Sequence, residues 1–415
     1  MVHVVFAIPF AMENTLRFAR AAASLPGVRL SVVSQDRADR FPADFRELLA
    51  GFEQVGDAMD PDQLGNGVEA LGKRVAPVER LLGILEPLQE PLAVVRERQR
   101  IRGMDAPTAR NFRDKSRMKD LFRAHDLPCA GHRLVGSVAE ALAFADQVGL
   151  PVVAKPPAGA GAKATARRDT IEDLQKFLRQ VPPAKGNEVL LEEFVRGREF
   201  SFDSVTLHGR HVFHNINCYY PTPLEVMENP WIQWCVVAPR DCEAPEFQAI
   251  HRLGPRALSV LGMWTGMSHM EWFRRHDGSI AISEVAARPP GAQFLSLISY
   301  ACDVDMYRAF VQLMVFETWE AKGRPFAAGA AYLRGQGGAG KTDLVVRAVH
   351  GLDQVQRRFG ELIVETRLPR LGAAPSTSYE GDGYLIVRHP DTRVVTEAVQ
   401  AIVATMRVEL GAATS

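Results

Sequence analysis

The chain has 415 residues, of which 47% are hydrophobic and 24% charged, so it can bury the cores of about two to four domains and is not a disordered chain. Lys+Arg and Asp+Glu both number 49, and this balance argues against a nucleic-acid partner. The five cysteines are odd in number and lack Cys-x-x-Cys spacing, so we expect neither a disulfide framework nor a structural zinc site, and reduced thiols in a cytoplasm are the simpler interpretation.

The N-terminal part begins with a βαβ pattern. An apolar run over residues 2–8 precedes a helix-period stretch over residues 13–25 and a second apolar run over residues 29–34. The first run is too short to cross a membrane, and no membrane partner is expected. No Gly-x-Gly-x-x-Gly follows it, so a dinucleotide site is not supported. We expect a helix over about residues 68–82 and a domain boundary near residue 105.

The middle of the chain alternates helical and strand-like segments. Asp114 can cap a helix that runs to about residue 125, and a strand over residues 151–155 precedes a Gly/Ala-rich loop over residues 156–163. Thr170 begins a further helix with a capping-box pattern. Strands are expected at residues 189–195, 198–207 and 211–219, followed by an irregular and functional segment over residues 220–243.

The last part of the chain begins with a helix over about residues 245–261, a hairpin, and another helix from about residue 292. From about residue 325, strands and helices alternate again, which is typical of a small α/β or α+β lid domain. The domains expected are therefore 1–105, 106–320 with a small subdomain at about 115–192, and 321–415.

The most informative segment is the hairpin MEWFRRHDGSIAISEVAARPPG. Asp277-Gly278 between alternating apolar residues predicts a two-residue turn. Counting outward from that turn places His276 opposite Ser279, Trp272 opposite Ser283, and Glu271 opposite Glu284. Because directly opposed Cβ atoms lie roughly 4.5–5.5 Å apart, the two carboxylates repel unless a cation lies between them.

The same count places Ala286 opposite His269 and Arg288 opposite Met267, on the face of the glutamates. Arg288 could then reach a phosphate beside the metal. Two alternatives remain: a wider turn that leaves both glutamates on a solvated face, and a general acid–base pair. The flanking arginine favours metal and phosphate.

Other segments suit a nucleotide. Lys115 lies just inside a helix start, where free amides favour anions, and Lys155 ends an apolar strand before the loop PPAGAGAK. In VLLEEFVRGREFSFD, Glu192 and Glu199 flank an apolar edge where an adenine and its ribose could bind. An ordinary acidic hairpin and a flexible linker remain the alternatives for these segments.

The order and spacing of five segments resemble the ATP-grasp superfamily, strongly over about residues 106–315. These segments are DK, VVAK-PPAGAGAK, LEEFVRGREF, HME and SEVAARPPG. The resemblance implies an α/β (α+β) ATP-grasp fold with a Rossmann-like N-terminal domain and a C-terminal lid domain. It also implies ATP and Mg²⁺ as cofactors, and it is compatible with a homodimer.

The resemblance assigns a role to each matching residue. Lys115 and Lys155 would bind ATP phosphates under the Gly159–Gly161 loop, and Arg288 would stabilise the transferring phosphoryl group. The adenine hinge would be formed by Glu192, Glu193 and Val195, and Glu199 would bind the ribose. Glu271 and Glu284 would be the magnesium ligands. One departure is Ala286, where many members carry Asn, and this puts a second magnesium ion in doubt.

The segment GQGGAGKT at residues 335–342 matches the Walker A pattern, but the β-branched residues after it predict a strand rather than the helix that this motif requires. We expect a strand, a glycine turn and a strand, with Lys341 close to a ligand only as part of a lid.

The resemblance implies an ATP-dependent carboxylate–amine ligase that activates a small carboxylate as an acyl phosphate and passes it to an amine with release of ADP. Lys155 and Arg288 would be the catalytic residues, and residues 214–234 would help to shape the acceptor pocket. The alternatives are a biotin carboxylase-like or other ATP-grasp carboxylase, and a nucleotide-binding regulator without turnover.

Overall fold

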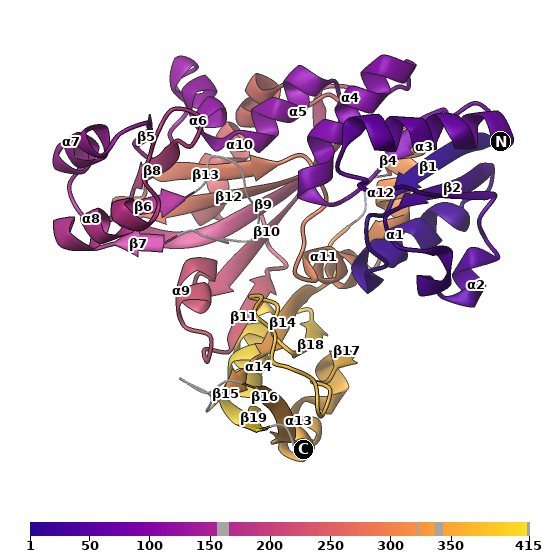
Figure 1. The fold of residues 1–415 in the computed structure, drawn as a ribbon. Helices are drawn as coiled ribbons and strands as arrows, with labels where there is room; N and C mark the ends of the chain where they lie inside the picture. The colour runs from indigo at the N-terminus through magenta and orange to yellow at the C-terminus, as the bar shows by residue number, and fades with distance from the viewer. Residues whose placement is uncertain (156–165, 321–322, 337–342, 413–415) are drawn as a thin grey trace.

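The computed structural model describes residues 1–155, 166–320, 323–336 and 343–412. A parallel N-terminal sheet lies at one end of the molecule, and a small sheet with two helices lies at the other (Figure 1). A large sheet runs between them and continues into the C-terminal strands. The Gly/Ala loop, with Gly159 and Gly161, and Lys341 lie outside the described residues.

The N-terminal sheet has four parallel strands in the order β3-β2-β1-β4, which confirms the expected βαβ beginning. Its strands are β1 Val2–Ala7, β2 Val28–Ser34, β3 Gly51–Gln54 and β4 Arg80–Leu82. The helices of this part are α1 Glu13–Ala23, η1 Ala38–Arg40, α2 Ala43–Arg46, α3 Pro61–Arg74, η2 Glu86–Leu88 and α4 Gln89–Gln99. The strands read as continuous apolar runs because helices cover both faces of the sheet.

The helix expected over residues 68–82 was wrong in its bounds. α3 starts seven residues earlier, at Pro61, where the Asp60 side chain accepts hydrogen bonds from the amides of Asp62 and Gln63. It ends at Arg74 because Pro77 disfavours helical backbone just before it. Residues 80–82 instead pair with β1 as β4.

The small sheet has the order β5-β8-β6-β7, with β5 His132–Val135, β6 Val152–Lys155, β7 Ala166–Arg168 and β8 Val189–Glu193. Around it lie α6 Lys115–Ala124, α7 Val138–Val148 and α8 Ile171–Gln180, while α5 Ala106–Arg113 packs against α4 and α6. The expected caps are confirmed: Asp114 accepts from the amide of Arg117, and Thr170 accepts from that of Asp173. These caps fix where the helices start, and with them the positions of the first-turn side chains.

The large sheet has eight strands in the order β13-β12-β9-β10-β11-β14-β18-β17. Its strands are β9 Gly197–Leu207, β10 Arg210–Tyr220, β11 Trp234–Ala238, β12 Gly266–Arg275, β13 Ile280–Ala286, β14 Ala327–Leu333, β17 Ile363–Arg367 and β18 Gly383–His389. Beside it lie α9 Pro223–Glu228, η3 Pro245–Phe247, α10 Gln248–Leu261, α11 Phe294–Cys302 and α12 Met306–Phe316. The C-terminal strands therefore continue the central sheet.

The expectation of an irregular segment over residues 220–243 was partly wrong. Thr222 caps α9, with Pro223 at its first position. Trp234–Ala238 forms a fully buried strand between β10 and β14, because Trp, Cys and Val fit a covered sheet position.

The C-terminal part also contains a three-stranded sheet in the order β15-β19-β16, made by β15 Gly335–Gln336, β16 Leu344–His350 and β19 Arg407–Ala412. Its helices are α13 Leu352–Phe359, η4 Gly360–Leu362 and α14 Thr392–Thr405. A strand follows the Walker-like segment, as predicted, so the helix that a phosphate-binding Walker loop needs is missing at residues 344–350. The domain bounds drawn from the sequence stay predictions.

Among the described residues, no helix combines the length and apolar character that crossing a lipid bilayer requires.

Candidate active site

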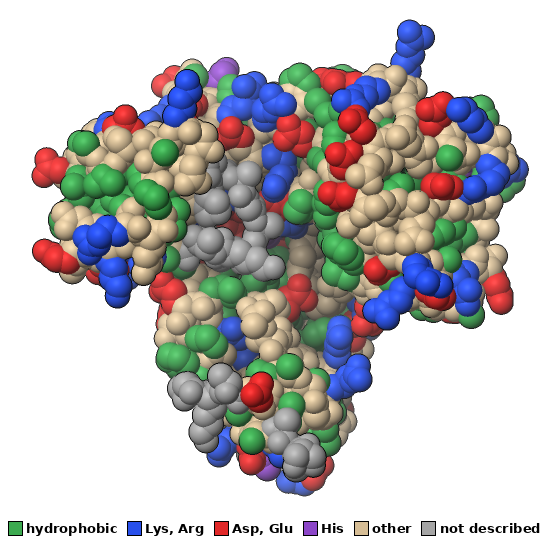
Figure 2. Space-filling view, viewed as in Figure 1, with side chains coloured by type: hydrophobic (Ala, Val, Ile, Leu, Met, Phe, Trp, Pro, Cys, Tyr) green, Lys and Arg blue, Asp and Glu red, His purple; other side chains and the backbone are tan. Residues whose placement is uncertain are grey.

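The opposed glutamates lie on neighbouring strands at the edge of the large sheet. Glu271 on β12 pairs directly with Glu284 on β13, and His269 pairs with Ala286, as the sequence predicted. Both glutamates line a pocket that also contains Lys115 and Lys155. The surface is hollowed where the parts of the molecule meet, with acidic and basic side chains near the hollow (Figure 2).

The turn that sets this register differs from the expected one. Arg275 donates its amide to Ser279, so the loop is the wider His276-Asp277-Gly278, with Gly278 at a φ of +83° that favours glycine. Trp272 therefore faces Ile282 rather than Ser283. A bulge at Ser283 then restores the count, and Glu271 still meets Glu284.

Lys115 occupies the first position of α6, directly after the capping residue Asp114. Its side chain is almost buried, and its Nζ lies 3.1 Å from Oε2 of Glu284. Burial opposes ionisation of Glu284, but Lys115 and Lys155 outweigh it and lower the pKa of Glu284 to about 2. Glu284 is therefore an anion at neutral pH.

Lys155 ends β6 and points at Glu192 on β8, with 2.9 Å between Nζ and Oε2. The other oxygen of Glu192 lies 2.8 Å from Nζ of Lys119, which is fully buried. Burial raises the pKa of Glu192, but the two lysines outweigh it and lower that pKa. The Glu192 side chain is thus held between two cations, and only its backbone is left for the expected adenine hinge.

Glu199 on β9 is buried in the same pocket. Burial, and then the charges of Glu271 and Glu284, raise the pKa of Glu199 well above its ordinary value. Excess negative charge therefore gathers at these three carboxylates. A divalent cation with oxygen ligands fits such a cluster, and Glu271 and Glu284 are candidates to hold it.

An apolar wall closes the pocket on the side of β8. Val195 is buried and packs with Ala130, Ala281 and Phe273. Glu193 next to it also lines the pocket, but its carboxylate binds Arg275 at 2.8 Å and accepts from the amide of Gly131. The wall is apolar and could pack against a purine, whose edge the backbone of this segment could bind.

Arg288 lies after β13 at the mouth of the pocket rather than opposite Met267, which pairs with Val205 on β9. The β12–β13 pairing ends at His269 and Ala286 because the chain turns away before Pro289. The guanidinium donates to Glu86 at 2.8 and 3.2 Å. Glu86 is contributed by the N-terminal part and also pairs with Arg113.

His269 is a hydrogen-bonding residue. Its Nδ1 lies 2.6 Å from Oδ1 of the buried Asp203, and its Nε2 lies 3.7 Å from Glu271. Burial lowers the pKa of His269, but Asp203 outweighs it and raises that pKa to about 9. The charged imidazole therefore partly offsets Glu271.

Sequence reasoning missed Lys119, Glu86, Asp203 and Tyr379. Lys119 lies four residues after Lys115 on the same helix, and this spacing could have placed it beside the site. Glu86 and Tyr379 come from distant segments without a motif, and only the folded chain brings them to the pocket.

Comparison with known proteins identifies the family of the central part. Residues 120–302 match the ATP-grasp domain family. The L-arginine-specific L-amino acid ligase of Bacillus subtilis is 23% identical over 248 residues, which are 59% of this chain and 59% of that protein. The match thus spans less than two thirds of that relative.

Solved structures resemble the whole fold. The L-amino acid ligase of Bacillus licheniformis gives a TM-score of 0.79 at 17% identity, covering 98% of each chain. The N5-carboxyaminoimidazole ribonucleotide synthetase of Thermotoga maritima gives 0.68 at 16% identity, covering 99% of this chain and all of the other. The resemblance to the ATP-grasp superfamily is confirmed: residues 120–302 contain an ATP-grasp domain, and the whole chain shares the fold of these solved structures.

Proposed function

We propose that the protein is an ATP- and Mg²⁺-dependent carboxylate–amine ligase that forms an amide and releases ADP and phosphate. The observation that carries this proposal is the pairing of Glu271 with Glu284 in one pocket with Lys115 and Lys155. The matching domain family and the similar amino acid ligases support the same reaction class.

The charged and apolar residues described above have separate roles in this reaction. Lys115 and Lys155 bind the phosphates, exchanging their present carboxylate partners for phosphate oxygens. Glu271 and Glu284 hold Mg²⁺, which when bound neutralises charge on the phosphates. Val195 and the backbone near Glu192 and Glu193 receive the adenine. The roles of Glu199 in binding the ribose and of Gly159 and Gly161 in covering the phosphates are inferred from the family resemblance alone.

Arg288 faces the transferring phosphoryl group and the substrate carboxylate. Its planar guanidinium can bind a carboxylate or phosphate with two parallel hydrogen bonds, and Glu86 fixes its direction. The carboxylate attacks the γ-phosphate to give an acyl phosphate and ADP, and the amine then displaces phosphate. Positioning and charge stabilisation supply the catalysis, and closure of the pocket keeps water from the acyl phosphate.

The substrates are small molecules, and an amino acid pair is the preferred class. Tyr219, Leu224 and Trp234 line the pocket and come from the segment that was expected to shape the acceptor site. The five free cysteines support a cytoplasmic location.

An ADP-release screen over amino acids, singly and in pairs, tests the proposal, with mass analysis of the products. We expect pair-dependent ADP release and a product lighter than the two substrates together by one water. Bicarbonate, with and without biotin, forms a separate arm of the screen. ADP release that needs bicarbonate would favour a carboxylase, and nucleotide binding without ADP release in every arm would favour a regulator.

A further inference from the structure

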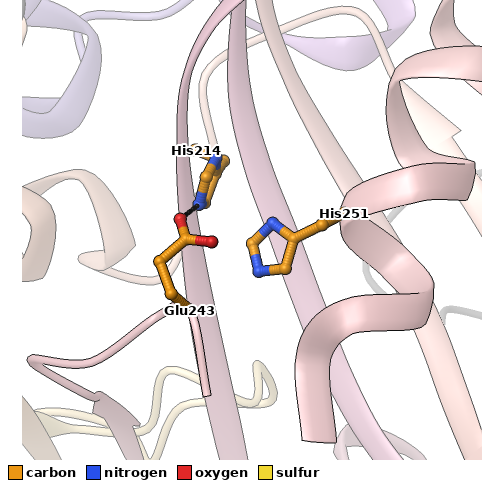
Figure 3. A group of neighbouring side chains, drawn as sticks. All are labelled: His214, Glu243 and His251. Carbon is orange, nitrogen blue, oxygen red and sulfur yellow. Dashed lines mark hydrogen bonds and ion pairs between the residues drawn. The ribbon is translucent and has the colours of Figure 1, made fainter. Parts of the chain in front are cut away.

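A second group of polar side chains lies away from the pocket. His214 on β10, Glu243 before η3 and His251 on α10 converge from three segments (Figure 3). Each offers one ligand atom, and these atoms all lie within 4.8 Å of one another. Nε2 of His214 lies 2.8 Å from Oε1 of Glu243, and the two imidazole rings are 4.3 Å apart between centroids.

This group lies on the other face of the large sheet. Successive side chains of a strand point to opposite faces. Asn215 and Asn217 of β10 bind Asp203, the partner of His269, on the face of the pocket. His214 directly precedes Asn215 on β10 and therefore points to the opposite face, where it meets Phe202 and His251 of α10.

Hydrogen bonds outside the group already orient both rings. Nε2 of His251 lies 2.7 Å from the backbone oxygen of Cys242, so it carries the proton and leaves the lone pair on Nδ1. Nδ1 of His214 lies 3.3 Å from Nε2 of His211, which can accept its proton when Nε2 of His214 binds a metal. Metal-binding histidines commonly donate their second N–H in this way.

We propose that His214, Glu243 and His251 bind a divalent ion of the zinc class. Two imidazole nitrogens and one carboxylate oxygen suit Zn²⁺ and not Mg²⁺, which prefers oxygen ligands. Ligand atoms around tetrahedral Zn²⁺ lie about 3.4 Å apart. The Glu243 side chain is 68% exposed, so its carboxylate can shift from its present contact with His214 to share an ion with both rings. The bound ion joins α10 and the segment before it to β10, with water as the fourth ligand.

Zn²⁺ titration of the metal-free full chain tests this site, with binding measured by calorimetry. We expect the wild type to bind one Zn²⁺ per chain and His251→Ala to lose this binding. In Glu243→Gln, the Kd for Zn²⁺ should rise at least tenfold. Glu243 is exposed, so its replacement leaves the fold intact, which circular dichroism checks.

Two control variants separate this site from others. Glu284→Gln alters the carboxylates of the pocket, and His350→Ala removes an exposed histidine that pairs with Glu409 at 2.8 Å. Both should keep the Zn²⁺ site. Unchanged binding in both His251→Ala and Glu243→Gln, loss of binding only in Glu284→Gln, or no Zn²⁺ binding by the wild type would each overturn the proposal.

Discussion

Glu192 and the carboxylate cluster formed by Glu199, Glu271 and Glu284 border the same pocket, and they differ in charge balance. Glu192 lies between Lys119 and Lys155, at 2.8 and 2.9 Å, so its charge is compensated within the protein. Glu199, Glu271 and Glu284 lie together, and the pKa of Glu199 is raised because of burial and the charges of the other two. Glu192 thus has a lysine on each of its oxygens, whereas in the carboxylate cluster Lys115 pairs with Glu284, His269 lies near Glu271, and Glu199 is the carboxylate whose ionisation is opposed. The same residue type thus pairs with two lysines in one place, and in the other it forms the cluster for which we propose a role in metal binding.

The largest effect should come from Glu284→Ala in the carboxylate cluster. Turnover in the ADP-release assay should fall at least a hundredfold, because the metal loses one of its two carboxylates. The thermal unfolding midpoint should fall somewhat while the fold stays intact, since the nearly buried Lys115 loses its carboxylate partner at 3.1 Å. Glu246→Ala, a half-exposed carboxylate outside the pocket, is the control. Near-normal turnover of Glu284→Ala would count against the assigned metal site.

Glu192→Gln should act mainly on the stability of the fold. Loss of this charge leaves Lys119 fully buried without its counter-ion, which should lower the free energy of unfolding by about 3–5 kcal/mol. Urea unfolding measures this change. Glu90→Gln removes an exposed partner of Arg110 and should cost less than about 1 kcal/mol. Equal losses in the two variants would mean that burial does not distinguish these pairs.

A pH series tests His269, which sits beside the carboxylate cluster. Its folded pKa of about 9 lies above the ordinary 6.5, so its stabilisation is complete below pH 6.5 and is lost as the pH rises through 9. Without Mg²⁺, the stability advantage of the wild type over His269→Gln should shrink by roughly 2–3 kcal/mol between pH 6 and 9.5. His350→Gln, a substitution of an exposed histidine, is measured alongside as the control. A constant difference across this range would contradict the charged pair with Asp203.

The smallest effect is expected for Glu199→Gln. Because the pKa of Glu199 is raised in the folded state, its ionisation destabilises the fold as the pH rises. Without Mg²⁺, the variant should be more stable than the wild type at pH 8 and show little difference near pH 4. Urea unfolding at the two pH values measures this gain. A loss of stability at pH 8 would mean that Glu199 has compensating contacts.

The sequence predicted the local features that depend on short spacings. Asp114 and Thr170 cap their helices as expected, and the opposition of Glu271 and Glu284 was predicted from one turn. That prediction succeeded through two compensating differences, a wider loop and a bulge at Ser283, which alternation of residue types does not reveal. The metal and phosphate roles of these residues remain proposals.

Features that depend on distant segments could not be predicted. Glu86 meets Arg288 across 202 residues, and Lys119 finds Glu192 only when α6 packs near β8. The strand Trp234–Ala238 was hidden because its neighbours are rich in Pro and Glu, and its buried position depends on β14 far along the chain. Secondary-structure propensity is a property of a single segment, whereas these contacts depend on the other segments that pack against it in the folded chain.

The shared eight-stranded sheet has a consequence for shortened forms of the protein. β11 pairs with β14 over five positions, from Trp234 with Tyr332 to Ala238 with Ala328. A chain ending near residue 320 would expose the unpaired edge of β11, an apolar strand that would pair with other copies. The C-terminal strands are thus needed to keep the catalytic part from self-association, and they cannot be removed as an independent appendage.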